Sequence, residues 1–133
     1  MKIERLHHVA IICSNYNHSK AFYTKILGFE IISETYRSER KSYKLDLAIP
    51  GGPQIELFSF PNPPKRLTHP EAMGLRHIAF QVSDLDSEVA CLISEGISVE
   101  PIRVDHLTHQ RFTFFSDPDG LPIELYESIK VAS

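Results

Sequence analysis

The sequence predicts an α+β fold built from two βαβββ modules in one domain. Two short motifs occur twice, in the same order along the chain. Residues 6–11 (LHHVAI) are similar to residues 75–80 (LRHIAF), and residues 54–57 (QIEL) are similar to residues 122–125 (PIEL). The second copies lie 69 and 68 residues after the first. Because these offsets agree to one residue, the repeat indicates a duplicated module rather than two unrelated motifs.

The first module, residues 1–60, is predicted to contain one helix and four strands. The β-branched run at 6–12 is short and is followed by turn residues, which favours a buried strand over a helix. Asn15 is a suitable N-cap and Gly28 a suitable left-handed C-cap, and the apolar residues between them predict a helix over 16–27. Runs of β-forming residues predict three further strands at 29–36, 43–49 and 54–60.

The second module, residues 74–128, repeats this order. Asp84 is a suitable N-cap for a helix with an apolar face, and Gly96 ends that helix as Gly28 ends the first. The Pro-rich segment 61–73 fits neither helix nor strand and is interpreted as a semi-rigid connection within a single domain, 1–133. The predicted strands of this module are 75–82, 97–104, 111–115 and 122–126, with a turn at 117–120.

Composition excludes several classes of partner. The 133 residues carry 14 Lys and Arg against 17 Asp and Glu, a net charge of −3, with no basic run, so we expect no nucleic-acid partner. No apolar run approaches the roughly 20 residues that span a bilayer, and the N-terminus lacks a signal-peptide pattern, so we expect no membrane partner and a cytoplasmic location. Cys13 and Cys91 are too few for a disulfide framework and are expected to be small buried residues.

Each module has a histidine near its start and a glutamate near its end. Alignment of the two copies places His8 opposite His77, and His7 opposite Arg76, which as a cation cannot ligate a metal. Alternate side chains of a strand face opposite sides, so His7 is expected to face away from the cavity that His8 faces. The predicted metal ligands are His8, Glu56, His77 and Glu124.

Two imidazoles and two carboxylates without a thiolate suit one divalent ion such as Zn, Ni, Co, Mn or Fe(II). An octahedral ion would keep two positions for water or for adjacent substrate oxygens, and such chelation stabilises the enediolate formed when a neighbouring carbon loses its proton. A single strand histidine is more often hydrogen-bonded in the core, and a single edge glutamate is more often solvated. Four such residues at matching module positions favour the metal site.

At these residues the sequence resembles the vicinal oxygen chelate superfamily, and most closely glyoxalase I and its uncharacterised bacterial relatives. The resemblance extends over essentially the whole chain. It implies curved mixed sheets that form a metal cup, with Glu124 as the mobile catalytic base and Glu56 as its counterpart. The motifs that carry it are 6–9 (LHHV), 21–29 (AFYTKILGF), 74–77 (GLRH), 117–120 (DPDG) and 123–125 (IEL).

The resemblance also separates the activities of the superfamily. Extradiol dioxygenases and fosfomycin-modifying transferases lack a carboxylate where Glu56 stands, whereas glyoxalase I and methylmalonyl-CoA epimerase have one. This favours a lyase or isomerase that transfers a proton. Bacterial glyoxalase I members hold arginine and asparagine for glutathione where this chain has Ile12 and Phe60. The resemblance therefore does not assign glutathione as the substrate.

Residues on the neighbouring strands are candidates for the substrate pocket. Arg111 begins a strand that should border the cup, where it would either pair with a substrate carboxylate or phosphate or be an exposed edge arginine. Lys44 and Asp46 share one face of a strand, but the sequence does not say which face is inward. The pocket candidates are Arg111, Tyr43, Lys44 and Asp46.

The expected partner is a small oxygenated molecule, and the expected assembly is a homodimer whose modules pair within a chain or between chains. Two other functions are open at this point. One is a metal-dependent dioxygenase, with Fe(II) retention and oxygen consumption as its signature. The other is a non-catalytic protein that sequesters a drug or other ligand, as bleomycin-binding relatives do. Intact metal ligands count against sequestration, because such binding proteins need no metal.

Overall fold

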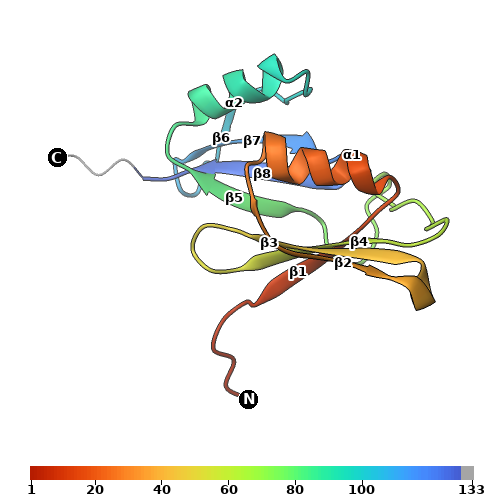
Figure 1. The fold of residues 1–133 in the computed structure, drawn as a ribbon. Helices are drawn as coiled ribbons and strands as arrows, with labels where there is room; N and C mark the ends of the chain where they lie inside the picture. Colours follow the sequence, from red (N-terminus) through yellow and green to blue (C-terminus); the bar gives the residue numbers. More distant parts are fainter. Residues whose placement is uncertain (130–133) are drawn as a thin grey trace. The chain divides into compact units, whose positions relative to one another are not determined.

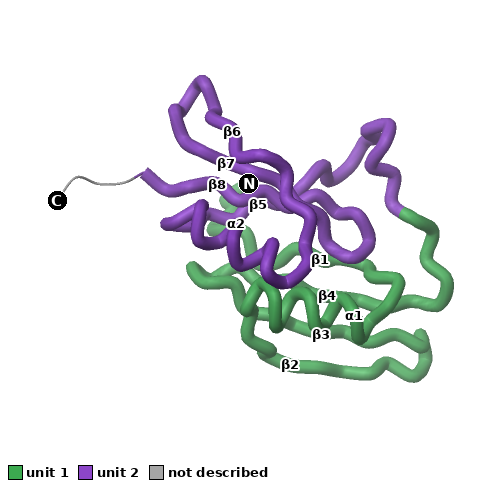
Figure 2. The backbone as a smooth tube through the Cα atoms, turned by 90° about the horizontal axis from the view of Figure 1, so that it is seen from above, with its two compact units in different colours: residues 1–65 green, residues 66–133 purple. Residues whose placement is uncertain are grey.

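The computed structural model describes residues 1–129 of the chain. These residues form two compact units, 1–65 and the part that begins at 66 (Figure 2). Each unit has its own helix and its own four-stranded sheet (Figure 1). No helix among the described residues is both long and apolar enough to cross a membrane. The α+β fold class and the two βαβββ modules are thereby confirmed, whereas the single-domain boundary remains a prediction.

Unit 1 follows the predicted order of one strand, a helix and three strands. Its sheet has the order β1-β4-β3-β2, with β1 parallel to β4 and the other neighbours antiparallel. The edge strand β2 has a register shift between Ile31 and Ser33. The elements are β1 (His8–Cys13), α1 (Tyr16–Ala21), the π-helix η1 (Phe22–Ile26), β2 (Glu30–Arg37), the 3-10 turn η2 (Ser38–Arg40), β3 (Ser42–Ala48) and β4 (Gln54–Ser59).

Unit 2 repeats this plan. Its sheet has the order β5-β8-β7-β6, and β5 is parallel to β8 as β1 is to β4. The elements are β5 (Ile78–Val82), α2 (Leu85–Ser94), β6 (Arg103–Val104), β7 (Arg111–Ser116) and β8 (Pro122–Glu127). The duplicated motifs therefore lie on equivalent strands, as the equal offsets predict.

The predicted N-caps are both present, since the side chains of Asn15 and Asp84 accept hydrogen bonds from the backbone N–H groups of the third residue after them. The first predicted helix, 16–27, is only α-helical to Ala21 and continues as the π-helix η1. The predicted strand 97–104 is reduced to β6. Glu100 is still joined to β7, because its backbone N–H donates to the Phe114 carbonyl at 2.9 Å. The early part of the predicted strand is therefore not a continuous strand but joins β7 at Glu100.

Strand alternation divides each sheet into two faces. In unit 1, α1 packs against β4, and the buried residues on that face of the sheet include Leu45, Leu47, Ile55 and Leu57. In unit 2 the buried residues beneath α2 are Thr113, Phe115, Ile123 and Leu125. We call the other side of each sheet its open face, meaning the face that the unit's own helix does not cover. Each unit therefore has its own apolar core, between its helix and its sheet.

The two cysteines differ in burial. Cys13 is buried at the end of β1, as predicted, whereas Cys91 is exposed on α2. The prediction for Cys91 was wrong because it rests on the usual burial of cysteine and not on helical phase. The buried side of α2 is defined by Leu85 and Leu92, and the residue before Leu92 points away from that side.

Leu57 provides a test of this core. Its side chain is 0% exposed at the centre of β4, so Leu57→Ala should lower the free energy of unfolding by about 2–5 kcal/mol through lost burial and a residual cavity. Urea denaturation monitored by circular dichroism measures this change. Leu6→Ala, the same substitution at a residue of unit 1 that is 60% exposed, serves as the control and should change stability little. Equal losses in the two variants would contradict the assigned core.

Candidate functional site

In unit 1 the site is built around Glu56, at the centre of β4. Parallel pairing sets Ala10 of β1 beside Glu56, and His8 is two residues before Ala10 on the same strand. His8 and Glu56 therefore share the open face of the sheet. The Nδ1 atom of His8 lies 3.3 Å from Oε2 of Glu56. The two predicted ligands of the first module are thus brought together.

Unit 2 contains an equivalent pair. Ala79 of β5 lies beside Glu124 of β8, and the Nε2 atom of His77 is 3.7 Å from Oε1 of Glu124. The ring of His77 packs edge-on against Phe114, with ring centroids 5.1 Å apart. His77 is the residue just before β5, whereas the predicted strand at 75–82 includes it. Its ring nevertheless reaches the partner that the repeat predicts.

The chemistry of these pairs suits a divalent metal. Each unit provides one imidazole nitrogen and one carboxylate oxygen in proximity, and the side chains of Glu56 and Glu124 are similarly buried, with 14% and 15% exposed. Such N and O donors without sulfur match the ligands of Zn, Ni, Co, Mn and Fe(II). Among residues 1–129 there is no group of three or more His, Cys, Asp or Glu side chains that could hold a metal ion. The centre of four ligands therefore stays a prediction.

His7 does not face away as expected. Its Nδ1 atom lies 2.9 Å from Nδ1 of His8, and the two rings meet at 85° with centroids 5.2 Å apart. The reason is that β1 begins at His8, so the alternation of a strand does not govern the side chain of His7. The backbone of His7 still joins the sheet, because its carbonyl accepts a hydrogen bond from Gln54 N–H at 3.0 Å. His7 is thus an additional polar neighbour of His8.

Lys44 and Asp46 lie on the open face beside Glu56. The Nζ atom of Lys44 is 3.0 Å from Oδ1 of Asp46 and 3.7 Å from Oε1 of Glu56. The hydrogen bond to Asp46, followed by its charge and that of Glu56, raises the pKa of Lys44 above its ordinary value. Burial acts to raise the pKa of Asp46, but the hydrogen bond from Ser33 and the contacts with Lys44 outweigh it and leave that pKa lowered. Lys44 is therefore a charged neighbour of one of the predicted ligands.

Tyr43 lies on the opposite face of the same strand. Its ring stacks on that of Tyr16 at the start of α1, with centroids 4.3 Å apart, and contacts Tyr36 at 4.8 Å. The hydroxyl of Tyr16 in turn donates to Glu34. These contacts place Tyr43 with the helix-covered side of the sheet and not with Glu56. The prediction that Tyr43 and Lys44 line the same cavity is therefore wrong, since neighbouring strand residues point in opposite directions.

Arg111 is also on the helix-covered side. Its guanidinium donates to both carboxylate oxygens of Glu127, at 2.7 and 3.1 Å, and to both oxygens of Asp86 on α2, at 2.8 and 3.3 Å. Hydrogen bonds and charge from Glu127 and Asp86 raise the pKa of Arg111. The prediction that it borders the cup is wrong, because alternation along β7 aligns it with buried Thr113 and Phe115. Arg111 attaches α2 to the sheet.

Three aromatic residues on the open face of unit 2 were not predicted. Phe112 and Phe114 of β7 pair with Tyr126 and Glu124 of β8, as Lys44 and Asp46 of β3 pair with Phe58 and Glu56 of β4. The hydroxyl of Tyr126 donates to Asp105 at 3.1 Å and is hydrogen-bonded to Thr108. Extending the repeat alignment from the glutamates to the preceding strands would have found these positions.

Comparisons with known proteins agree over nearly the whole chain. The model of the family described as Glyoxalase/Bleomycin resistance protein/Dioxygenase superfamily matches residues 5–125. The uncharacterized protein YwkD of Bacillus subtilis is 62% identical over 127 residues, which cover 96% of this chain and 99% of that protein. The uncharacterized protein YaeR of Escherichia coli is 58% identical over 125 residues, covering 94% and 97%. The crystal structure of a glyoxalase family protein from Enterococcus faecalis has 47% identity and a TM-score of 0.88, covering 96% of this chain and 100% of that one.

The assignment of Arg111 to the fold predicts a loss of stability in Arg111→Met. This change would leave the carboxylate of Glu127, which is 6% exposed, without its guanidinium partner, and a buried charge that loses its partner is destabilising. The urea midpoint of unfolding should fall well below that of wild type. Arg103→Met is the control, because its partner Glu100 is exposed and such a pair contributes little. A stable Arg111→Met protein would contradict this role.

Proposed function

The chain belongs to the Glyoxalase/Bleomycin resistance protein/Dioxygenase superfamily, and from this premise we propose that it is a metal-dependent lyase or isomerase. Members of the superfamily typically bind a divalent metal and commonly act on or bind small molecules. The observation that carries the proposal is the repeated approach of a histidine nitrogen to a glutamate oxygen, at 3.3 Å in unit 1 and 3.7 Å in unit 2. A duplicated fold needs no such histidine–glutamate pair for its stability, whereas the proposed metal site needs the pair in each unit.

The proposed ligands are His8, Glu56, His77 and Glu124, which would hold one divalent ion. When bound, that ion would supply Lewis-acid polarisation of two adjacent oxygens of a small substrate, such as an α-hydroxycarbonyl, a thiohemiacetal or a CoA thioester. The protein contributes by fixing each glutamate on a central strand between two hydrogen-bonded neighbours. Such backing keeps the carboxylates in place before a ligand arrives.

We assign the role of general base to Glu124. On the open face of unit 1, Glu56 lies 3.7 Å from the ammonium of Lys44, which holds its carboxylate by charge. Within the described part of the chain Glu124 forms no ion pair with a lysine or arginine, and its neighbour on β7 is the ring of Phe114. A carboxylate that is not held by a fixed cation is better able to accept a substrate proton and return it. The difference between the two surroundings supports Glu124 over Glu56.

Metal uptake is the first test of the proposal. Protein purified without chelator should contain about one divalent ion per chain, and metal-stripped protein should take up Ni, Co or Zn, as measured by elemental analysis. His8→Ala and His77→Ala should each lower the metal content strongly, because each removes one of four ligands. His106→Ala, in the exposed loop after β6, is the matched control and should retain the metal. Absence of metal uptake by the wild-type protein would refute the proposed centre.

Solvent deuterium exchange tests the reaction. In D₂O, candidate substrates with a carbon acid next to a carbonyl should incorporate deuterium in the presence of the metal-loaded protein, as followed by NMR. Glu124→Gln should slow this exchange by about 10²- to 10⁴-fold, because general-base catalysis usually contributes that much. Glu56→Gln, the same substitution at the equivalent carboxylate of unit 1, is the comparison variant. Oxygen consumption with Fe(II) would instead identify a dioxygenase. Ligand binding without exchange or turnover would identify a sequestering protein.

A further inference from the structure

Two arginines on unit 1 flank one aromatic ring. The guanidinium carbon of Arg37, at the end of β2, lies 5.7 Å from the ring centroid of Phe60 and 4.9 Å from that of Phe58. The guanidinium carbon of Arg40, in η2, lies 5.3 Å from the Phe60 centroid. The rings of Phe58 and Phe60 are themselves stacked, with centroids 6.0 Å apart. The two cations are therefore held close together by a shared aromatic platform.

Neither guanidinium is neutralised within the described part of the chain. None of the ion pairs among residues 1–129 includes Arg37 or Arg40. One Nη of Arg37 donates to the hydroxyl of Ser42 at 2.9 Å, but its Nε is buried and has no hydrogen-bond partner there. A buried charged donor without an acceptor is unusual, because its desolvation is not compensated. The pair therefore has both charge and donor capacity for an anion.

Arg103 of unit 2 is a similarly stacked arginine that does have a carboxylate partner. Its guanidinium carbon lies 5.0 Å from the centroid of Phe112 and 5.8 Å from that of Phe114, nearly the same stacking geometry. Unlike Arg37 and Arg40, it has a carboxylate partner, because its Nη2 is 3.5 Å from Oε2 of Glu100. Stacking on phenylalanine is thus common to both units. The missing counter-charge is particular to unit 1.

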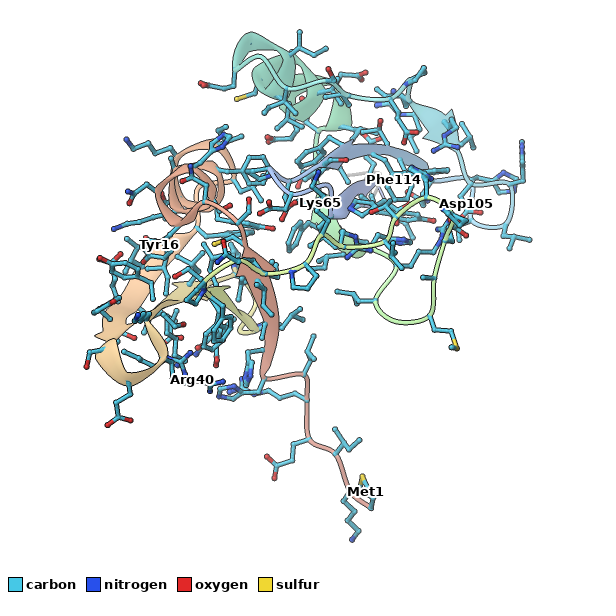
Figure 3. The ribbon with its side chains drawn as sticks, turned by 90° about the vertical axis from the view of Figure 1, so that its right-hand side faces the viewer. Met1, Tyr16, Arg40, Lys65, Asp105 and Phe114 are labelled. Carbon is cyan, nitrogen blue, oxygen red and sulfur yellow. The ribbon has the colours of Figure 1, made fainter. Side chains whose placement is uncertain are left out.

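The arginine pair shares the open face with Glu56. Register sets Arg37 beside Ser42, whose side chain lies on the same face as those of Lys44 and Asp46. Figure 3 labels Arg40 at the β2–β3 turn and Tyr16 at the helix on the other side of this sheet. Phe58, in β4, and Phe60, just after β4, follow Glu56 at alternate positions, and four residues of extended chain span about 13 Å. The two guanidinium groups therefore lie against the rings of the residues that follow Glu56 along the chain.

We propose that Arg37 and Arg40 form an oxyanion-binding site, which takes a carboxylate or phosphate at the end of the substrate remote from the reacting oxygens. Two guanidinium groups can donate several charge-assisted hydrogen bonds to such a group, and the phenylalanine rings hold them in position. The substrate class is then an elongated anion whose charged end lies at the rings of Phe58 and Phe60 when its reacting end lies at Glu56. The assignment to a substrate rests on the proposed function, whereas the oxyanion site itself does not.

Titration of chelator-treated protein tests the site without metal or turnover. Inorganic phosphate and succinate are added in separate experiments at constant ionic strength, and binding is followed by NMR of the arginine Nε–H groups. Saturable binding of either anion is expected, and the tighter of the two identifies the terminal group as phosphate or carboxylate. Arg40→Gln should weaken this binding by about tenfold or more, the effect of losing one charge-assisted hydrogen bond.

The controls distinguish loss of the oxyanion site from misfolding, from loss of any stacked arginine and from loss of the metal centre. Arg40 lies in an exposed turn, so Arg40→Gln should fold with an unchanged thermal midpoint. Arg103→Gln removes a similarly stacked arginine in unit 2 and should bind the anions as wild type does. His77→Ala should also bind them, so that failure of the metal centre does not affect the result. Absence of saturable binding to both anions, or equal weakening in Arg103→Gln, would overturn the proposal.

Discussion

The parallel pairing of the first strand of each unit with its last strand is the constraint on which the candidate site depends. It sets Ala10 beside Glu56 in unit 1 and Ala79 beside Glu124 in unit 2. A shift of one residue would turn each glutamate into the helix-covered core and bring a neighbouring apolar residue to the open face. The buried leucines and isoleucines on either side of each glutamate prevent this shift, because they would lose their burial. Burial of the core thus fixes the position of the polar site.

The parts of the structure that were predictable from the sequence are those set by local periodicity. The repeat located the strands that bear Glu56 and Glu124, and in the structure the residues on either side of each glutamate are buried in the core. Predictions failed where contacts between distant residues decide the outcome. Arg111 is bound by Asp86 and Glu127, 25 and 16 residues away, and no local pattern reports that both carboxylates reach it. His7 was placed wrongly because the strand begins at His8, two residues later than the apolar pattern suggests.

The two modules have kept the glutamates but not their surroundings. On β3 the open face carries Lys44 and Asp46, whereas the equivalent positions of β7 carry Phe112 and Phe114. Charged groups beside one carboxylate and aromatic rings beside the other give two different electrostatic environments, even though the backbones repeat. Duplication therefore supplied a symmetric framework, and substitutions on the open faces made its halves chemically distinct. This asymmetry is what allows two related glutamates to have different roles.

The arginines of the chain show how their positions on the sheets separate stability from binding. Arg111, on the helix-covered side, is bound by two carboxylates and holds a helix to its sheet. Arg37 and Arg40, at the other face of unit 1, rest on phenylalanine rings and have no carboxylate partner among residues 1–129. A guanidinium that is already paired adds little to ligand binding, since its donors are occupied, whereas an unpaired one retains its full attraction for an anion. Substitutions on the helix-covered faces should accordingly affect stability first, and those on the open faces should affect ligand recognition first.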